Sequence, residues 1–137
     1  MVFLTRRERF NAAHRLFINS WSDEQNEEAF GKCSNPNWHG HNYELFVTIK
    51  GKLNKETGFL VNLKDLSTII KENIIDKIDH KNLNLDVDFM KDKMPSSENL
   101  VIEIWKQLEP ELLKIGVKLH CIKLTETENN FVEYYGN

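Results

Sequence analysis

The chain has 137 residues, of which 40% are hydrophobic and 28% charged, a balance typical of a single soluble globular domain covering residues 1–137. The net charge of −3 excludes a strongly basic surface, so we expect neither nucleic acid nor a membrane as a partner. No apolar run is long enough for a membrane span or a signal peptide, and two cysteines make a poor disulfide framework. We therefore expect a cytoplasmic protein with free thiols at Cys33 and Cys121.

Residues 2–16 and 41–53 are the two strands that the first half of the chain predicts. The earlier segment alternates weakly, and His14 shares one face with Phe10 and Ala12. The later segment is the clearest strand in the sequence, because apolar side chains occupy its alternate positions: Tyr43, Leu45, Val47 and Ile49.

Residues 17–37, between these strands, are polar and irregular. Trp21 and Phe30 argue against disorder, so we expect an ordered excursion with a helical turn over residues 23–30. Long loops inside compact domains usually carry function.

Two amphipathic helices follow in the second half. Asn62 is a suitable N-cap for a helix that ends near residues 79–80. Ser96 is the expected cap of the second helix, with Glu98 in the first turn, where a carboxylate complements the helix dipole. Pro110 should kink or end this second helix, because proline lacks the backbone N–H of a helix interior.

Residues 117–127 and 131–135 predict two further strands, joined at residues 129–130, where asparagine tolerates a turn conformation. The order β, β, α, α, β, β predicts an α+β fold: a four-stranded antiparallel sheet with two helices on one face. A chain of this size has no second layer for the other face. We therefore expect self-association to cover it.

His39 and His41 lie at the start of the clearest strand, and side chains two residues apart on a strand project to the same side. His14, on the neighbouring predicted strand, could complete the set. Three neutral imidazoles with an open fourth position are the ligand set of a catalytic zinc site. The residues alone leave two alternatives open: a chance pair on a solvent-facing strand, and a structural zinc site with Cys33 as fourth ligand.

Three other features could carry chemistry. If Cys33 is partly exposed near a cation, its thiol would ionise easily and could act as a base or nucleophile; otherwise it fills a gap in the packing. Asp79 could orient His80 for proton transfer, or the two could cap a helix. Glu126 could accept two parallel hydrogen bonds from the amidine-like edge of a pterin or guanine, or it could be a solvated strand residue.

Six short motifs occur in order along the chain. They are residues 10–16 (FNAAHRL), 31–33 (GKC), 39–43 (HGHNY), 79–83 (DHKNL), 97–99 (SEN) and 126–130 (ETENN). Together they resemble the family of 6-pyruvoyltetrahydropterin and 6-carboxytetrahydropterin synthases, nearly from end to end. The resemblance implies a tunnelling (T-) fold whose subunits close sheet to sheet into trimeric barrels. Two trimers would stack into a hexamer, with active sites at the interfaces.

The matched positions fall into three groups. The zinc ligands of the family, for one Zn²⁺ per chain, are matched by His14, His39 and His41. The catalytic triad is matched by Cys33, Asp79 and His80. The pterin pocket is matched by Glu126 as the anchor and by Glu98 as a second acid.

The resemblance implies a carbon–oxygen lyase that acts on 7,8-dihydroneopterin triphosphate. Zinc would bind hydroxyl oxygens of the substrate side chain, and the Cys33 thiolate would move a proton that His80 and Asp79 relay. Elimination of triphosphate and internal proton shifts would give 6-pyruvoyltetrahydropterin without a nicotinamide or flavin. The triphosphate would meet positive charge from one or more of Arg9, Arg15 and Lys32.

Two alternatives compete with the pyruvoyl product. The 6-carboxytetrahydropterin synthases of queuosine biosynthesis use the same substrate but typically have a shorter cysteine-to-histidine loop and a shorter excursion. Here five residues separate Cys33 from His39, as in the pyruvoyl type, whereas Trp38 replaces a small residue of that type and changes the pocket beside the zinc. The alternative of another class is a non-catalytic pterin- or purine-binding protein, which would not need zinc ligands, thiol and Asp-His pair together.

Overall fold

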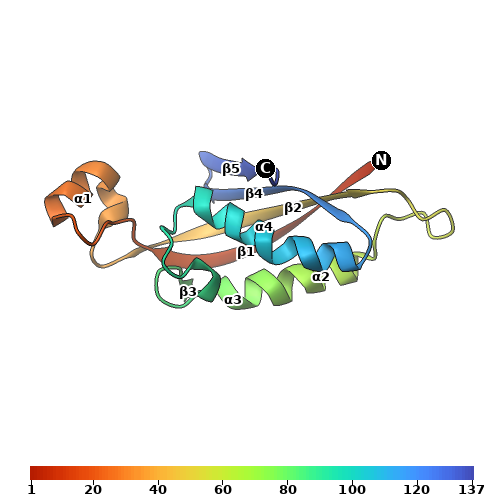
Figure 1. The fold of residues 1–137 in the computed structure, drawn as a ribbon, viewed down its shortest axis with the longest axis horizontal. Helices are drawn as coiled ribbons and strands as arrows, with labels where there is room; N and C mark the ends of the chain where they lie inside the picture. The colour runs from red at the N-terminus through yellow and green to blue at the C-terminus, as the bar shows by residue number, and fades with distance from the viewer.

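The computed structural model describes residues 1–137 as an α+β fold with one five-stranded sheet (Figure 1). The strand order is β3-β1-β2-β4-β5. The strands are β1 (Val2–His14), β2 (His39–Gly51), β3 (Lys81–Asn82), β4 (Lys118–Thr127) and β5 (Asn130–Tyr134). The pairs β1–β2, β2–β4 and β4–β5 are antiparallel, as expected for the four predicted strands.

The expectation of a four-stranded, wholly antiparallel sheet is wrong by one strand. β3 lies parallel to β1 and pairs with Ala12 and Ala13. The chain enters this pairing at His80, whose backbone N–H donates to the carbonyl oxygen of Asn11 at 2.6 Å. A two-residue strand has no alternation that a sequence could show, so periodicity does not predict it.

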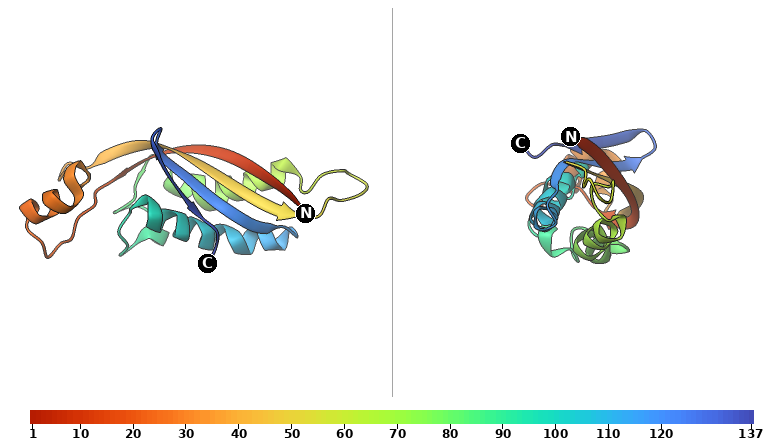
Figure 2. Two further views of the ribbon diagram at one scale, coloured as in Figure 1. Left: turned by 90° about the horizontal axis from the view of Figure 1, so that it is seen from above. Right: turned by 90° about the vertical axis from the view of Figure 1, so that its right-hand side faces the viewer.

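The two predicted helices cover one face of the sheet (Figure 2, left). The first is a continuous run of α2 (Leu63–Ile70), a π-helical segment (Lys71–Ile75) and α3 (Asp76–Ile78), and the second is α4 (Ser97–Lys114). Both predicted caps are confirmed: the Asn62 side chain accepts from the backbone N–H of Lys64, and that of Ser96 from Asn99.

A further helix, α1 (Asp23–Phe30), forms where a helical turn was expected. Ser22 caps it in a reciprocal capping box with Gln25. Figure 2 shows α1 on an arm that extends beyond the end of β1 and β2, away from the two covering helices.

Of the two effects expected of Pro110, a kink or an end of its helix, the end is wrong, because α4 continues to Lys114. Proline in a helix interior costs about 3 kcal/mol. Leu108 and Leu112, before and after the proline, are both fully buried, and burial of a leucine side chain contributes about 1.5–3 kcal/mol. Packing on the sheet therefore outweighs the local preference.

The core lies between the sheet and the two covering helices. The apolar side chains at alternate positions of β2 and those of the first covering helix are at most 1% exposed. They are Tyr43, Leu45, Val47 and Ile49 from β2, and Leu66, Ile70, Ile74 and Ile78 from the helix. None of the helices combines the length and the apolarity needed to cross a bilayer.

The opposite face of the sheet carries no helical layer. Most side chains that alternate with the core positions of β1 are polar, such as Arg7, Arg9 and Asn11, but Phe3 is 54% exposed. On the neighbouring strands Lys123 lies against the rings of Phe46 and Phe131, at 5.2 and 4.1 Å from their centroids. This face therefore combines polar side chains with exposed aromatic rings, Phe131 among them.

Glu103 of α4 is a buried charge whose pairing offers a test of the packing. Its carboxylate lies 2.8 Å from Nζ of Lys106 and 3.1 Å from Nζ of Lys93, with 8% of the side chain exposed. Burial raises the pKa of Glu103, but the two lysine hydrogen bonds outweigh it and leave the pKa below its usual value. This stabilisation is present above the unfolded-state pKa and is lost as the pH falls through the folded-state pKa.

We expect Glu103→Gln to lower the free energy of unfolding by about 1–2 kcal/mol at pH 7, measured by urea denaturation. The difference from the parent should begin to shrink as the pH falls below about 4.3, the ordinary pKa of glutamate in the unfolded chain, and be lost once the pH passes below the lowered pKa of the folded state. Glu111→Gln is the matched control, because its pair with Lys114 on the same helix is exposed and should contribute less than about 0.5 kcal/mol. Equal losses at pH 3 and pH 7, or in both variants, would contradict this account.

Candidate active site

The register of β1 and β2 brings three histidines together. His14 lies opposite His39, and Ala12 lies opposite His41. The ligand nitrogens of the three histidines lie within 4.8 Å of one another, and their ring centroids are 4.5–5.0 Å apart. His14 is fully buried, so the alternative of a chance histidine pair on a solvent-facing strand does not describe this cluster.

His14 is oriented by the segment that precedes α4. Its Nδ1 lies 2.8 Å from the carbonyl oxygen of Pro95, which can only accept, so Nδ1 carries the proton and Nε2 presents a lone pair. Nε2 of His14 faces Nε2 of His39 at 2.8 Å. Burial lowers the pKa of all three imidazoles, including His41, which favours the neutral form that a metal ion requires.

Two other ring nitrogens of the cluster are buried without a hydrogen-bond partner: His39 Nδ1 and His41 Nε2. His41 Nε2 lies 3.3 Å from Oε1 of Glu126, but this contact lacks hydrogen-bond geometry. Unpaired polar atoms in a buried site are costly, and a cation among the rings would engage their lone pairs. An all-nitrogen set of three imidazoles fits Zn²⁺ with an open fourth position, so the cluster could hold a metal ion.

Cys33 lies in the short 3₁₀ turn Gly31–Ser34 that follows α1. It lines a hollow of about 1020 Å³ together with His39, His41 and Lys32. The thiol lies outside the set of clustered ligand atoms. Burial, with a smaller effect of the Glu126 carboxylate, raises the pKa of the thiol. This direction is opposite to the expected easy ionisation, so a thiolate at this position needs added positive charge.

Asp79 and His80 form the contact that the sequence suggested. Nδ1 of His80 lies 3.0 Å from Oδ1 of Asp79. That oxygen also accepts the backbone N–H of Asn11 at 2.9 Å, and this hydrogen bond is the main cause that lowers the pKa of Asp79. The His80 side chain is 76% exposed.

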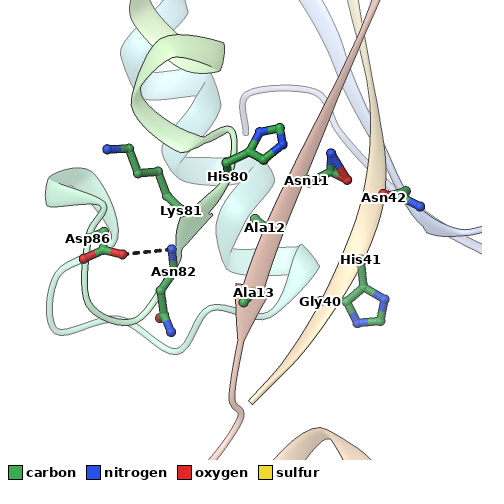
Figure 3. Close-up of a pocket in the computed structure, with 10 residues that line it drawn as sticks. All are labelled: Asn11, Ala12, Ala13, Gly40, His41, Asn42, His80, Lys81, Asn82 and Asp86. Carbon is green, nitrogen blue, oxygen red and sulfur yellow. Dashed lines mark hydrogen bonds between the residues drawn. The ribbon is translucent and has the colours of Figure 1, made fainter. Parts of the chain in front are cut away.

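Within one chain, His80 and Cys33 line different hollows. His80 lines a hollow of about 540 Å³ with Asn11, Lys81 and other residues (Figure 3). The figure shows strand β1 between His80 and His41. His41 lines both hollows. The three residues that match the catalytic triad are therefore not assembled around one hollow of the single chain.

Glu126 and Glu98 line a third hollow, of about 370 Å³. The hydroxyl of Ser97 donates to Oε2 of Glu126 at 2.6 Å, while Oε1 points toward His41. Sequence reasoning missed the supporting roles of Ser97 and Pro95. The SEN motif contains Ser97, but no local pattern connects either residue with a strand and a histidine so distant in sequence.

The sequence model of the family described as 6-pyruvoyl tetrahydropterin synthase matches residues 3–137. The chain belongs to this family. A 6-pyruvoyl tetrahydrobiopterin synthase of Dictyostelium discoideum is 47% identical over 135 residues, covering 98% of this chain and 96% of the relative. The solved structure of the Caenorhabditis elegans 6-pyruvoyl tetrahydropterin synthase superimposes with a TM-score of 0.89 at 35% identity, over 99% of this chain and 96% of that one.

A 6-carboxy-5,6,7,8-tetrahydropterin synthase of Bacillus subtilis is also similar. It is 30% identical over 112 residues, which cover 78% of this chain and 73% of the relative. Both the identity and the coverage are lower than for the Dictyostelium member of the 6-pyruvoyl tetrahydropterin synthase family.

The first site prediction concerns metal binding. We expect the protein to bind one Zn²⁺ per chain in equilibrium dialysis and His39→Ala to bind less than about a tenth of that at the same free zinc, because two imidazoles alone bind weakly. His120→Ala is the matched control, since His120 packs against Phe3 on another part of the sheet. Equal loss in both variants, or retention in His39→Ala, would contradict the assignment.

The second site prediction concerns the backbone at Trp38, which precedes His39 and has a φ of 68°. A side chain with a Cβ is disfavoured there by about 1–2 kcal/mol, whereas glycine is not. We expect Trp38→Gly to unfold at higher urea concentration than Trp38→Ala, because both variants lose the indole and only glycine also removes the strain. If the alanine variant proves as stable as the glycine variant, the backbone at Trp38 is not strained.

Proposed function

We propose that this chain is a zinc-dependent lyase that converts 7,8-dihydroneopterin triphosphate into 6-pyruvoyltetrahydropterin and triphosphate. The observation that carries the proposal is the cluster of three neutral imidazoles with the Cys33 thiol in the adjoining hollow and the Glu126 carboxylate beside His41. The similarity to 6-pyruvoyl tetrahydrobiopterin synthases along nearly the whole chain supports the pyruvoyl product.

His14, His39 and His41 would hold the zinc ion. Bound there, the ion supplies positive charge that favours the thiolate of Cys33, and Lewis acidity toward a side-chain oxygen of the substrate. Pro95 contributes by fixing the ring of His14 through its carbonyl oxygen, the usual role of a partner to a metal-binding histidine.

Cys33 would act as the base that removes a proton from the substrate side chain. Its turn lines the hollow that His39 and His41 also line, so a substrate carbon bound beside the imidazoles would share this hollow with the sulfur. Among the three basic residues considered for the triphosphate, Lys32 and Arg15 both line this hollow, whereas Arg9 lines another hollow with Asp79. The Arg15 guanidinium is already engaged by the Ser34 carbonyl oxygen and by Asp23, and Lys32 forms no ion pair. We assign the triphosphate to the side of Lys32.

Glu126 would anchor the pterin ring. Ser97 engages only its Oε2, and Oε1 has no hydrogen-bond donor. A carboxylate can accept two parallel N–H bonds from the 2-amino group and N3–H of a pterin. Glu98 lines the same hollow and provides a second acid for this end of the substrate.

The proton relay from Cys33 to His80 and Asp79 would require a second copy of the chain, because the two groups line different hollows of one copy. The outer edge of β1 is paired only over the two residues of β3, and β5 leaves the opposite edge free. Free strand edges favour pairing with another chain, and closed barrels remove them. We propose a homo-oligomer of trimeric barrels, two of which form a hexamer.

The test is mass analysis of the products formed from 7,8-dihydroneopterin triphosphate by the zinc-loaded protein. We expect the mass of 6-pyruvoyltetrahydropterin and stoichiometric triphosphate. Cys33→Ala should lower turnover by about 10²–10⁴-fold, the usual contribution of a general base, with zinc content and circular dichroism unchanged. Cys121→Ala, which removes the buried thiol, should retain parental turnover.

Three results would contradict parts of the proposal. Detection of the mass of 6-carboxytetrahydropterin would show that the protein is a 6-carboxytetrahydropterin synthase, the alternative that Trp38 leaves open. Tight binding of the substrate without release of triphosphate would identify a non-catalytic pterin-binding protein. Parental turnover in Cys33→Ala would exclude Cys33 as the base.

A further inference from the structure

Asn84 holds the backbone of Arg15 at both of its polar groups. Its Oδ1 accepts the N–H of Arg15 at 2.9 Å, and its Nδ2 donates to the carbonyl oxygen of Arg15 at 2.9 Å. Only an amide offers a donor and an acceptor at this side-chain length. Asn84 follows β3, which begins directly after His80, so this contact ties the segment of His80 to the residue that follows His14.

Arg15 in turn holds the turn that carries Cys33. Its Nε donates to the carbonyl oxygen of Ser34 at 2.7 Å, and the next backbone N–H, of Leu16, donates to the carbonyl oxygen of Cys33 at 2.8 Å. The Arg15 side chain is 15% exposed, and its guanidinium carbon lies 4.1 Å from the centroid of the Phe17 ring.

Charge pairing does not explain the burial of Arg15. The one acid near its guanidinium, Asp23, is 3.8 Å away and 89% exposed, so the pair is weak in water. The guanidinium is therefore used mainly as a directed donor and as a planar group stacked on a ring.

We propose that Arg15 and Asn84 are positioning residues for Cys33. They fix the turn Gly31–Ser34 to the end of β1 and so place the thiol relative to the imidazoles on β1 and β2. Without the contacts of Arg15 and Asn84, the turn would be attached to β1 only through the long excursion that begins at Phe17. The turn could then move, and the position of the sulfur would be less precise. The inference rests on the proposed role of Cys33, because only that role makes its position matter for turnover.

Two measurements on the zinc-loaded protein test the proposal. The alkylation rate of Cys33 by iodoacetamide, read by peptide mass mapping, reports how the thiol is held, with buried Cys121 as internal reference. For Arg15→Ala we expect Cys33 to be alkylated several-fold faster, because the freed turn exposes it. We also expect kcat to fall by about 10–100-fold at nearly unchanged KM, because misplacement of a reacting group acts on the chemical step.

The conservative variant separates position from charge. Arg15→Lys keeps the positive charge but puts a methylene where arginine has Nε, so it should behave like Arg15→Ala. Asn84→Ala should change both readouts in the same direction. The double variant, Arg15→Ala with Asn84→Ala, should show a smaller decrease in kcat than the product of the two single fold-decreases, because both residues hold the same turn. Arg7→Ala, on the exposed face of β1, should leave both readouts at parental values.

Parental alkylation and kcat in Arg15→Ala would overturn the inference, as would restoration of both by Arg15→Lys, which would show a role for charge alone. If Arg15→Ala does not fold, Asn84→Ala decides in its place. Absence of turnover in the parent would refute the proposed function. The alkylation rates of Cys33 in the parent and in the variants would still decide whether Arg15 and Asn84 hold its turn in place.

Discussion

The antiparallel pairing of β1 with β2 determines where the histidines lie, because side chains on a strand alternate between faces. With His14 opposite His39, three imidazoles share the inner face of the sheet. A slip of one residue would send one strand's histidines to the other face. The core maintains the register: Phe10 stacks on Tyr43 with ring centroids 4.8 Å apart. Packing of the core and assembly of the metal site therefore depend on the same pairing.

The start of α4 supports the site from the side of the helices. The carbonyl oxygen of Pro95 orients the ring of His14, and two residues later the hydroxyl of Ser97 binds Glu126. Both contacts come from the turn that Ser96 caps. A single helix start thus positions the metal-ligating side and the pterin-binding side of the proposed site. Arg15 and Asn84 supply the corresponding support for the Cys33 turn.

Much of the fold and of the site could be predicted where the information is local. The alternation in β2 and the caps Asn62 and Ser96 predicted the elements that form. The spacing of His39 and His41 indicated a shared face because strand parity depends on sequence separation alone. The motifs that resemble pterin synthases then pointed to Cys33 and Glu126, which lie beside the histidines, and to Asp79 and His80, which line other hollows of the single chain.

The remaining features depend on contacts that no local pattern contains. β3 is too short for periodicity, and the helix passes Pro110 because of burial on both sides of it. The raised pKa of the Cys33 thiol depends on its burial in the folded chain. Cys33 and His80 line different hollows because the segments that carry them lie on different sides of β1, and the sequence does not show on which side a segment will lie.

The central claim is that three imidazoles hold zinc while Cys33 remains a free base. X-ray absorption at the zinc edge of the loaded, substrate-free protein tests it most directly. The account expects nitrogen and oxygen scatterers at about 2.0–2.1 Å and no sulfur. A sulfur shell at about 2.3 Å that disappears in Cys33→Ala would make Cys33 a ligand, and the site would then be a structural zinc site.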